Sequence, residues 1–219
     1  MHRPAARGII VPMSDQKLRE LERRWKESES VEDEAVYLRE RVRVGGLTQD
    51  RLELAASCGH PAARRAMCLP EHGALAPAIE SLARGLGTQG LIAAATDAVA
   101  DIRDAVESGG AVERLLVAAR DWLECPCDEH GAACIQAAAF DHQGMHPAVG
   151  CYSGLLWWTS ERTRGSMPAT MQNQHFLHLQ SLCEHLASIS GRGHWEQWRS
   201  MTASLGAKLL ANPMAQDPR

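Results

Sequence analysis

The sequence has few aromatic residues other than tryptophan, and it has no long apolar run. Its 219 residues include two tyrosines and two phenylalanines against six tryptophans. Because runs of β-branched and aromatic residues are the usual material of strands, little of the chain suits a sheet. An apolar stretch such as residues 154–158 is far shorter than the about 20 residues that a helix needs to cross a bilayer. We therefore expect a helical protein with no membrane association.

Basic residues are also fewer than acidic residues. The 23 Lys and Arg residues are outnumbered by 27 Asp and Glu residues, which gives a formal net charge of -4. A nucleic-acid-binding protein normally has a basic face. Here the arginines between residues 15 and 43 alternate with acids, so their fields largely cancel. We expect solvated helix faces there and no nucleic-acid partner.

The chain lacks a regular cysteine framework and an apolar leader. It has seven cysteines, an odd number that leaves at least one outside any disulfide. Reduced thiols in the cytoplasm are the simpler interpretation. The apolar run at residues 8–11 is shorter than the about seven residues of a signal-peptide core. These features predict a cytoplasmic protein.

Several motifs of common enzymes are missing. The sequence contains no GxxxxGK[ST] loop, no GxGxxG that follows a strand, no HExxH and no GxSxG. These absences remove the simplest nucleotide-binding, zinc-protease and hydrolase interpretations. An active site assembled in space from distant residues stays open, but the sequence favours a protein that is not an enzyme.

Helical periodicity and helix-capping residues are what the sequence does contain. Ser14, Ser30 and Thr48 each precede apolar residues at helical spacing, and Pro61 suits the first turn of another helix. Glycines at 45–46, 59 and 109–110 end or separate helices. The later helices are predicted at residues 75–84, 88–107, 112–124, 126–140, 149–162, 173–189 and from 193 to just before 213. The fold class is all-α, an array of helical hairpins packed as a solenoid-like or bundle domain.

The composition divides the chain into a charged part and an alanine-rich part. We predict a flexible leader at 1–13, a charged helical module at 14–68, an alanine-rich bundle at 69–212 and a flexible tail at 213–219.

One segment concentrates soft metal ligands. Cys125, Cys127, His130 and Cys134 lie within ten positions, and zinc takes four such ligands in a tetrahedron. If Pro126 begins the helix, Cys127 and Cys134 are about 10 Å apart along its axis, too far to share one ion. The feasible subsets are His130 with Cys134, or Cys125 with Cys127 and His130. Either subset needs further ligands, with these candidates: Cys58, His60, Cys68, His72 and Cys151.

This segment also has structural and redox interpretations. C-x-C-x2-H-x3-C is not a standard zinc spacing, and Cys134 also suits a helical core. A thiolate at a helix start could be a redox group, although Glu124, Asp128 and Glu129 oppose its formation. We expect no cofactor on balance, with zinc as the ion that the segment would bind.

Four tryptophans are candidates for a partner surface. Trp157 and Trp158 are adjacent, and Trp195 and Trp198 are three residues apart. Aromatic residues are enriched at binding hot spots. Burial in the core of the bundle is the alternative for both pairs.

The segment from Leu18 to Ala66 resembles a helical module of uncharacterised proteins from myxobacteria and related bacteria. The matching features are Leu-Glu-Arg-Arg-Trp, Val-Glu-Asp-Glu-Ala, Tyr-Leu-Arg-Glu-Arg, and Leu-Ala-Ala followed by Gly-His. The segment from Trp122 to His130 also looks like one that follows this module. The resemblance covers about a quarter of the chain and brings no catalytic residues. It implies a bacterial helical protein that works with partners in a conflict or immunity system.

Two functions follow from these observations. The first is a non-enzymatic subunit, an adaptor or an immunity-like protein, whose helical surface binds another protein. The alternative is a metal-binding or thiol-dependent protein centred on residues 125–134. The sequence does not predict an oligomeric state.

Overall fold

The protein is built from α-helices throughout the part that the structure describes. A computed structural model describes residues 13–106, 110–139, 146–163 and 174–211, and within these ranges it contains no strand. The all-α fold class is thereby confirmed. In chain order the helices are α1 (Met13–Ser28), α2 (Val31–Arg43), α3 (Gln49–Ser57), α4 (Pro61–Ala66), α5 (Leu75–Asp101), α6 (Arg103–Val106), α7 (Ala111–Glu124), α8 (Asp128–Ala138), α9 (Pro147–Thr163), α10 (Gln174–Ser190) and α11 (His194–Ala211).

The predicted leader, apart from Met13, and the predicted tail lie outside the described residues. Among the helices that are described, none combines the length and the apolar character that crossing a membrane requires.

The first helices begin where their capping residues predict. The Ser30 side chain accepts a hydrogen bond from the backbone N–H of Asp33, and the Thr48 side chain accepts one from Arg51. Each bond satisfies an N–H group that has no partner inside its helix. Pro61 is the first residue of α4, where a missing N–H costs nothing.

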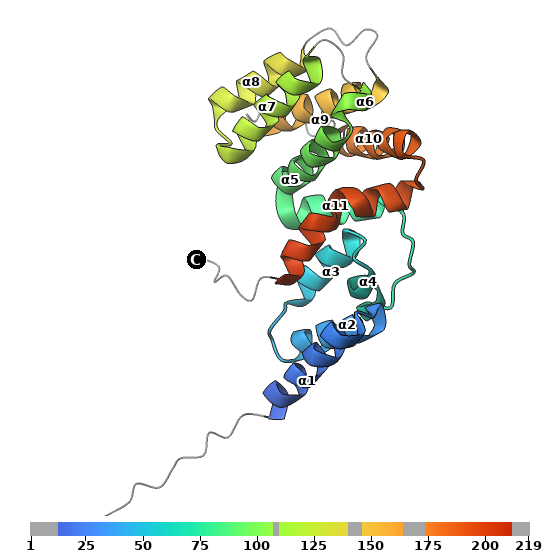
Figure 1. The fold of residues 1–219 in the computed structure, drawn as a ribbon. Helices are drawn as coiled ribbons and strands as arrows, with labels where there is room; N and C mark the ends of the chain where they lie inside the picture. The colour runs from blue at the N-terminus through green and yellow to red at the C-terminus, as the bar shows by residue number, and fades with distance from the viewer. Residues whose placement is uncertain (1–12, 107–109, 140–145, 164–173, 212–219) are drawn as a thin grey trace, which may run out of the picture.

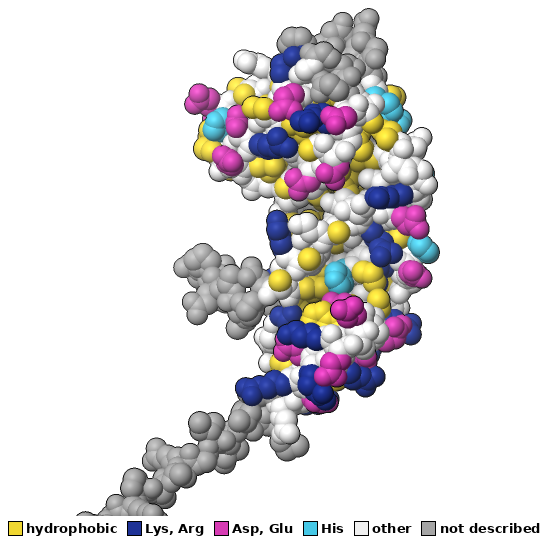
Figure 2. Space-filling model, in the orientation of Figure 1, with side chains coloured by type: hydrophobic (Ala, Val, Ile, Leu, Met, Phe, Trp, Pro, Cys, Tyr) yellow, Lys and Arg dark blue, Asp and Glu magenta, His cyan; other side chains and the backbone are white. Residues whose placement is uncertain are grey.

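The charges of α1 and α2 are paired with one another. Arg23 contacts Glu27 at 2.9 Å and Lys26 contacts Glu22 at 2.7 Å, both between side chains of α1. Figure 2 shows basic and acidic side chains intermingled over this end of the molecule. Between the two helices, Trp25 stacks on Tyr37 with ring centroids 5.2 Å apart, and ion pairs such as Lys17–Glu40 at 3.2 Å also join them. Solvated charged faces thus surround an aromatic contact.

Helix α5 contains the glycines of a GxGxxG pattern. Gly85, Gly87 and Gly90 all lie inside α5, and Gly87 has a non-helical backbone (φ 71°, ψ 179°) that kinks the helix there. A dinucleotide-binding turn requires these glycines between a strand and a helix. The kink accounts for the break that the sequence predicts in this region, and the surroundings exclude the dinucleotide turn.

Helix α11 brings the end of the chain back to its beginning. The helices form an elongated array, with α1 and α2 at one end, α7 and α8 at the other, and α11 crossing the middle (Figure 1). Trp198 on α11 donates from its indole Nε1 to the Ser57 carbonyl at 2.8 Å, and the Thr202 hydroxyl donates to the Cys58 carbonyl at 2.7 Å. One connected cluster of buried residues extends from Ala35 on α2 to Leu210 on α11.

Candidate metal centre

The connection between α7 and α8 brings Cys125, Cys127 and His130 together. Helix α7 ends at Glu124, and α8 begins at Asp128 rather than at Pro126. The prediction that the helix starts at Pro126 is therefore wrong by two residues. Cys125 and Cys127 instead have extended backbones, with φ of -138° and -97°. Because they lie outside regular helix, their side chains can approach the first turn of α8.

The three side chains are close enough to hold one ion. Their ligand atoms all lie within 4.8 Å of one another, and the group is at the surface. The Cys127 sulfur is 3.4 Å from His130 Nδ1. In tetrahedral zinc, with bonds of about 2.3 Å to sulfur and about 2.0 Å to nitrogen, a sulfur and a nitrogen are about 3.5 Å apart. The spacing of this pair is close to that of two zinc ligands.

Without a metal, the imidazole is held by a hydrogen bond. His130 Nδ1 lies 2.9 Å from the Cys125 carbonyl oxygen, and since a carbonyl only accepts, Nδ1 carries the proton. This bond is the main cause of the raised pKa of His130. A metal that binds through Nδ1 must replace that proton, whereas binding through Nε2 requires the ring to turn.

The two thiols differ in acidity. The backbone N–H of His130 lowers the pKa of Cys127, which caps the positive end of α8. The pKa of Cys125 is raised, chiefly because its thiol hydrogen-bonds to Cys127. Cys127 therefore loses its proton first, and Cys125 is the thiol for which a metal must compete with protons.

The surroundings of the site are acidic. Asp121 and Glu129 both raise the pKa of His130 by their charge, and Glu124 and Asp128 are exposed on either side of the connection. These carboxylates oppose thiolate formation when no metal is present. Their negative potential attracts a divalent cation, so the same residues favour metal binding.

Cys134, the fourth candidate ligand, does not belong to this group. It is fully buried, and its thiol donates to the Ala118 carbonyl at 3.2 Å. Burial raises its pKa to about 11. Its position on the buried side of α8 packs that helix against α7, so it has the structural role that the sequence analysis gave as the alternative. The feasible subset is thus Cys125 with Cys127 and His130.

The further cysteines and histidines proposed as extra ligands do not join the group. In the described part of the chain it is the one cluster of three or more metal-ligating side chains. All seven cysteines are free thiols. Cys58 is buried at the end of α3, where burial raises its pKa to about 12, and Cys68 is exposed beyond α4.

Of the four tryptophans proposed as a partner surface, two are buried and two are half-buried. Trp198 is 0% exposed and Trp195 is 7% exposed. Each donates from its indole nitrogen to a backbone carbonyl, Trp195 to that of Glu71 at 3.0 Å. Trp157 and Trp158 are half-buried and meet edge to face at 4.9 Å. The pair on α11 therefore belongs to the core, because both rings are buried and both indole nitrogens have hydrogen-bond partners within the protein.

Some exposed apolar residues were missed by the sequence analysis. Helical spacing groups Val31 with the buried Ala35 and Leu38, yet Val31 is 38% exposed. Val36 and Leu69 are also exposed, at 37% and 43%. Spacing alone could not find them, because it shows which residues share a face but not which part of that face is covered.

Comparison of the chain with protein-family models, with curated proteins and with solved structures finds no match.

Proposed function

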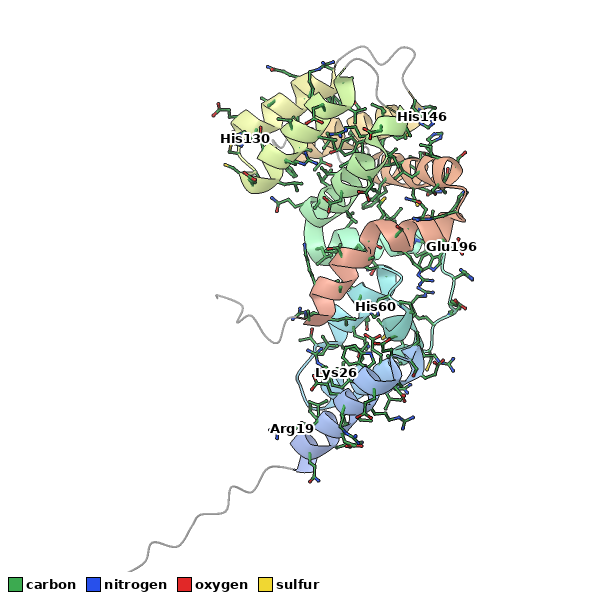
Figure 3. The ribbon with its side chains drawn as sticks, in the orientation of Figure 1. Arg19, Lys26, His60, His130, His146 and Glu196 are labelled. Carbon is green, nitrogen blue, oxygen red and sulfur yellow. The ribbon has the colours of Figure 1, made fainter. Side chains whose placement is uncertain are left out.

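We propose that this protein binds a zinc ion through Cys125, Cys127 and His130, at the exposed connection between α7 and α8. The observation that supports the proposal is the convergence of two thiols and one imidazole within 4.8 Å. Two sulfurs and one nitrogen are a donor set that suits zinc better than magnesium or calcium, which prefer oxygen ligands. Figure 3 shows His130 at this end of the molecule, on the first turn of α8.

Three protein ligands leave the fourth position of a zinc tetrahedron open. Closed structural sites use four side chains, whereas sites that act on or bind an outside group keep one position free. Cys125 is exposed and Cys127 is half-buried, so a water molecule or a group from another molecule can reach an ion held there. The site is therefore suited to bind a ligand rather than to hold the fold together.

Metal titration tests this proposal. The protein is purified without a histidine tag, reduced, stripped with a chelator and titrated with zinc against a chromophoric competitor. We expect one equivalent to bind. Losing an outer-shell partner costs about 10- to 100-fold in affinity, so Cys127→Ser, which removes a direct ligand, should cost at least about a hundredfold. Cobalt(II) in place of zinc should give the visible bands of a tetrahedral site with thiolate ligands.

Cys68→Ser is the matched control, because Cys68 is exposed and outside the group. It should bind zinc as the unmodified chain does. Clearly substoichiometric zinc in the unmodified chain, or equal loss in the Cys127 and Cys68 variants, would contradict the proposal. Mass spectrometry of the reduced sample checks that no disulfide joins Cys125 to Cys127 during the titration.

A second candidate function, binding to another protein, is favoured by an exposed apolar surface near α2 and α4. Val31, Val36 and Leu69, here called the α2–α4 patch, border two adjoining hollows of about 340 and 610 Å³. Glu32 and Arg65 line both hollows. Apolar residues inside a charged rim are the usual composition of a protein interface. This surface, and not the buried pair Trp195 and Trp198, is where an adaptor or immunity-like subunit would bind its partner.

Charge placed in the α2–α4 patch tests this second function. Val36→Glu should abolish binding of a purified partner that the unmodified chain binds in solution. Val117→Glu is the matched control, because Val117 is 46% exposed on α7, away from the patch. Equal binding by both variants would show that the patch is not the interface.

A further inference from the structure

Two adjoining clefts lie away from the cysteine and histidine group: a larger one between α11 and the connection from α3 to α4, and a smaller one that is the first hollow of the α2–α4 patch. Their volumes are about 600 and 340 Å³, within the range of small-molecule sites. Gly59, Pro61 and Arg199 line both clefts and so mark the place where they meet. Figure 3 shows two lining residues, His60 beside α11 and Glu196 near the start of that helix.

Arg199 has a charge that no described neighbour neutralises. It is half-buried on α11 and makes no hydrogen bond or ion pair within the described residues. A partly buried charge without a counter-ion is costly unless something pairs with it. Its charge contributes to lowering the pKa of both His60 and Arg64, after the larger effect of burial. The three side chains thus form a site where added positive charge is unfavourable.

Arg64 strengthens this positive potential. It is buried, and its guanidinium donates to the carbonyls of Pro70, Ala56 and His72 at 2.7, 3.2 and 3.4 Å. Its other face lies over the Trp195 ring, 4.6 Å from the centroid. Carbonyl dipoles and a ring stabilise the guanidinium but do not cancel its charge.

Acids are present at the clefts but do not pair with Arg199. Glu196 lines the larger cleft together with Arg192 and Arg199. The smaller cleft is lined by Glu32 and Glu71 as well as by its arginines. With Arg199 counted in both, basic side chains outnumber acidic ones by one in each cleft: Arg192 and Arg199 against Glu196, and Arg64, Arg65 and Arg199 against Glu32 and Glu71.

His60, which lines the larger cleft, contains a buried polar atom without a partner in the described part of the chain. Its Nδ1 is buried and has no hydrogen-bond partner among the described residues. Its Nε2 is 3.8 Å from a Glu34 carboxylate oxygen. Buried polar atoms in native proteins nearly always have a partner, so an orphaned one calls for a missing ligand or water.

The backbone holds Arg199 in place. Gly59 has a positive φ of 78°, and a methyl group at this position would overlap Arg199 Cγ. Because Gly59 has no side chain, the arginine stem can lie directly on the α3–α4 connection. This contact positions the stem of Arg199, and the residue lines both clefts.

We propose that the larger cleft binds a small organic oxyanion, a phosphate or a carboxylate, through Arg199. The guanidinium fork pairs two-to-two with either group. The rest of the ligand lies along the small side chains that α11 presents to the cleft, including Ala203 and Ala207.

Calorimetric titration with inorganic phosphate and with succinate, at constant ionic strength, tests this site. We expect saturable binding of at least one of them, with a Kd of about 1 mM or tighter. Arg199→Gln should weaken it by at least about tenfold, the effect of a lost charge-assisted pair. Tighter binding of phosphate identifies a phosphate ester as the ligand class, and tighter binding of succinate identifies a carboxylate. Either result supports the proposal.

Arg120→Gln is the matched control, since Arg120 is exposed on α7 and lines neither cleft. Ala203→Phe provides a steric variant that keeps the charge; Ala203 is exposed on α11, so the variant should fold, and its ring should block the cleft. No saturable binding by the unmodified chain would overturn the proposal. So would equal affinity in the Arg199 and Arg120 variants, or full affinity in Ala203→Phe. If Arg199→Gln unfolds, the affinity of Ala203→Phe in the same titration tests the proposal.

Discussion

Replacing Trp198 by phenylalanine tests how α11 is joined to the beginning of the chain. Trp198 is 0% exposed, and its indole Nε1 donates to the Ser57 carbonyl at 2.8 Å. Ser57 is the last residue of α3, so its carbonyl accepts no bond within that helix. Phenylalanine keeps an aromatic ring in the core but removes both the hydrogen bond and part of the buried surface.

The two losses can be added. Leaving the part-buried Ser57 carbonyl without its partner costs about 1–3 kcal/mol. The smaller ring forfeits about 1–2 kcal/mol of apolar burial. The free energy of unfolding should therefore fall by about 3 kcal/mol. For a chain of this size, each kcal/mol lowers Tm by about 2–4 °C, so we expect a loss of roughly 10 °C.

Urea denaturation followed by circular dichroism measures this change. Trp157→Phe is the control, because Trp157 is half-buried, and its replacement should cost less than about 1 kcal/mol. Equal stability of the Trp198 variant and the unmodified chain would refute the packing of α11 on α3. Equal losses in both variants would show that the cost comes from the ring alone and not from the bond to Ser57.

Three further predictions concern single groups. Cys134→Ala should leave zinc affinity unchanged while it lowers the free energy of unfolding by about 1 kcal/mol, as zinc titration and urea denaturation will show; weaker zinc binding would place Cys134 among the ligands. The hydrogen bond from Arg43, with a smaller contribution from Lys17, holds the pKa of Glu40 down at about 2, below its ordinary value of 4.5. The stability that the Glu40 carboxylate adds is therefore complete above about pH 4.5 and is lost as the pH falls toward 2. Glu40→Gln should therefore be less stable than the unmodified chain at neutral pH, with a gap that narrows in acid; a gap independent of pH would contradict this. Zinc affinity should rise with pH beyond neutrality, because the raised pKa of Cys125 makes it the second of the two ligand thiols to lose its proton. In Cys125→Ser that part of the pH dependence should disappear.

The helices were predictable where local residues determine them. Ser30 and Thr48 cap helices in the sequence and do so in the structure, with hydrogen bonds to residues three positions on. Local rules failed at α8, because Pro126 suits a first helical position as well as it suits a connection. In the structure Pro126 lies in the connection before α8, and the Cys127 sulfur lies 3.4 Å from His130 Nδ1.

The clefts beside α11 could not be predicted from the sequence. Arg199 lies on Gly59, which is 140 positions earlier in the chain. No periodicity or motif connects residues so far apart. The tryptophans of α11 illustrate the same difficulty, since spacing places Trp195 and Trp198 on one side of a helix without indicating whether that side faces core or solvent.

The division of the chain into a charged module and an alanine-rich bundle stays a prediction. The structure adds that α11, from the second segment, packs on α3, from the first, within one cluster of buried residues. Composition separates these segments because α1 and α2 have long solvated faces. Packing brings them together because Trp198 and Thr202 bond to the end of α3.

Two cysteines and two arginines show how the same residue type has a structural role at one position and a proposed binding role at another. Cys134 and Arg64 are buried, and each donates hydrogen bonds to backbone carbonyls inside the fold. Their hydrogen bonds account for their presence in the fold. Cys127 and Arg199 are the same residue types at more accessible positions, and the packing gives neither a comparable role. The thiol lies beside an imidazole and a second thiol, and the guanidinium lines two clefts without a counter-ion among the described residues. These are therefore the two groups for which we propose a ligand from outside the chain.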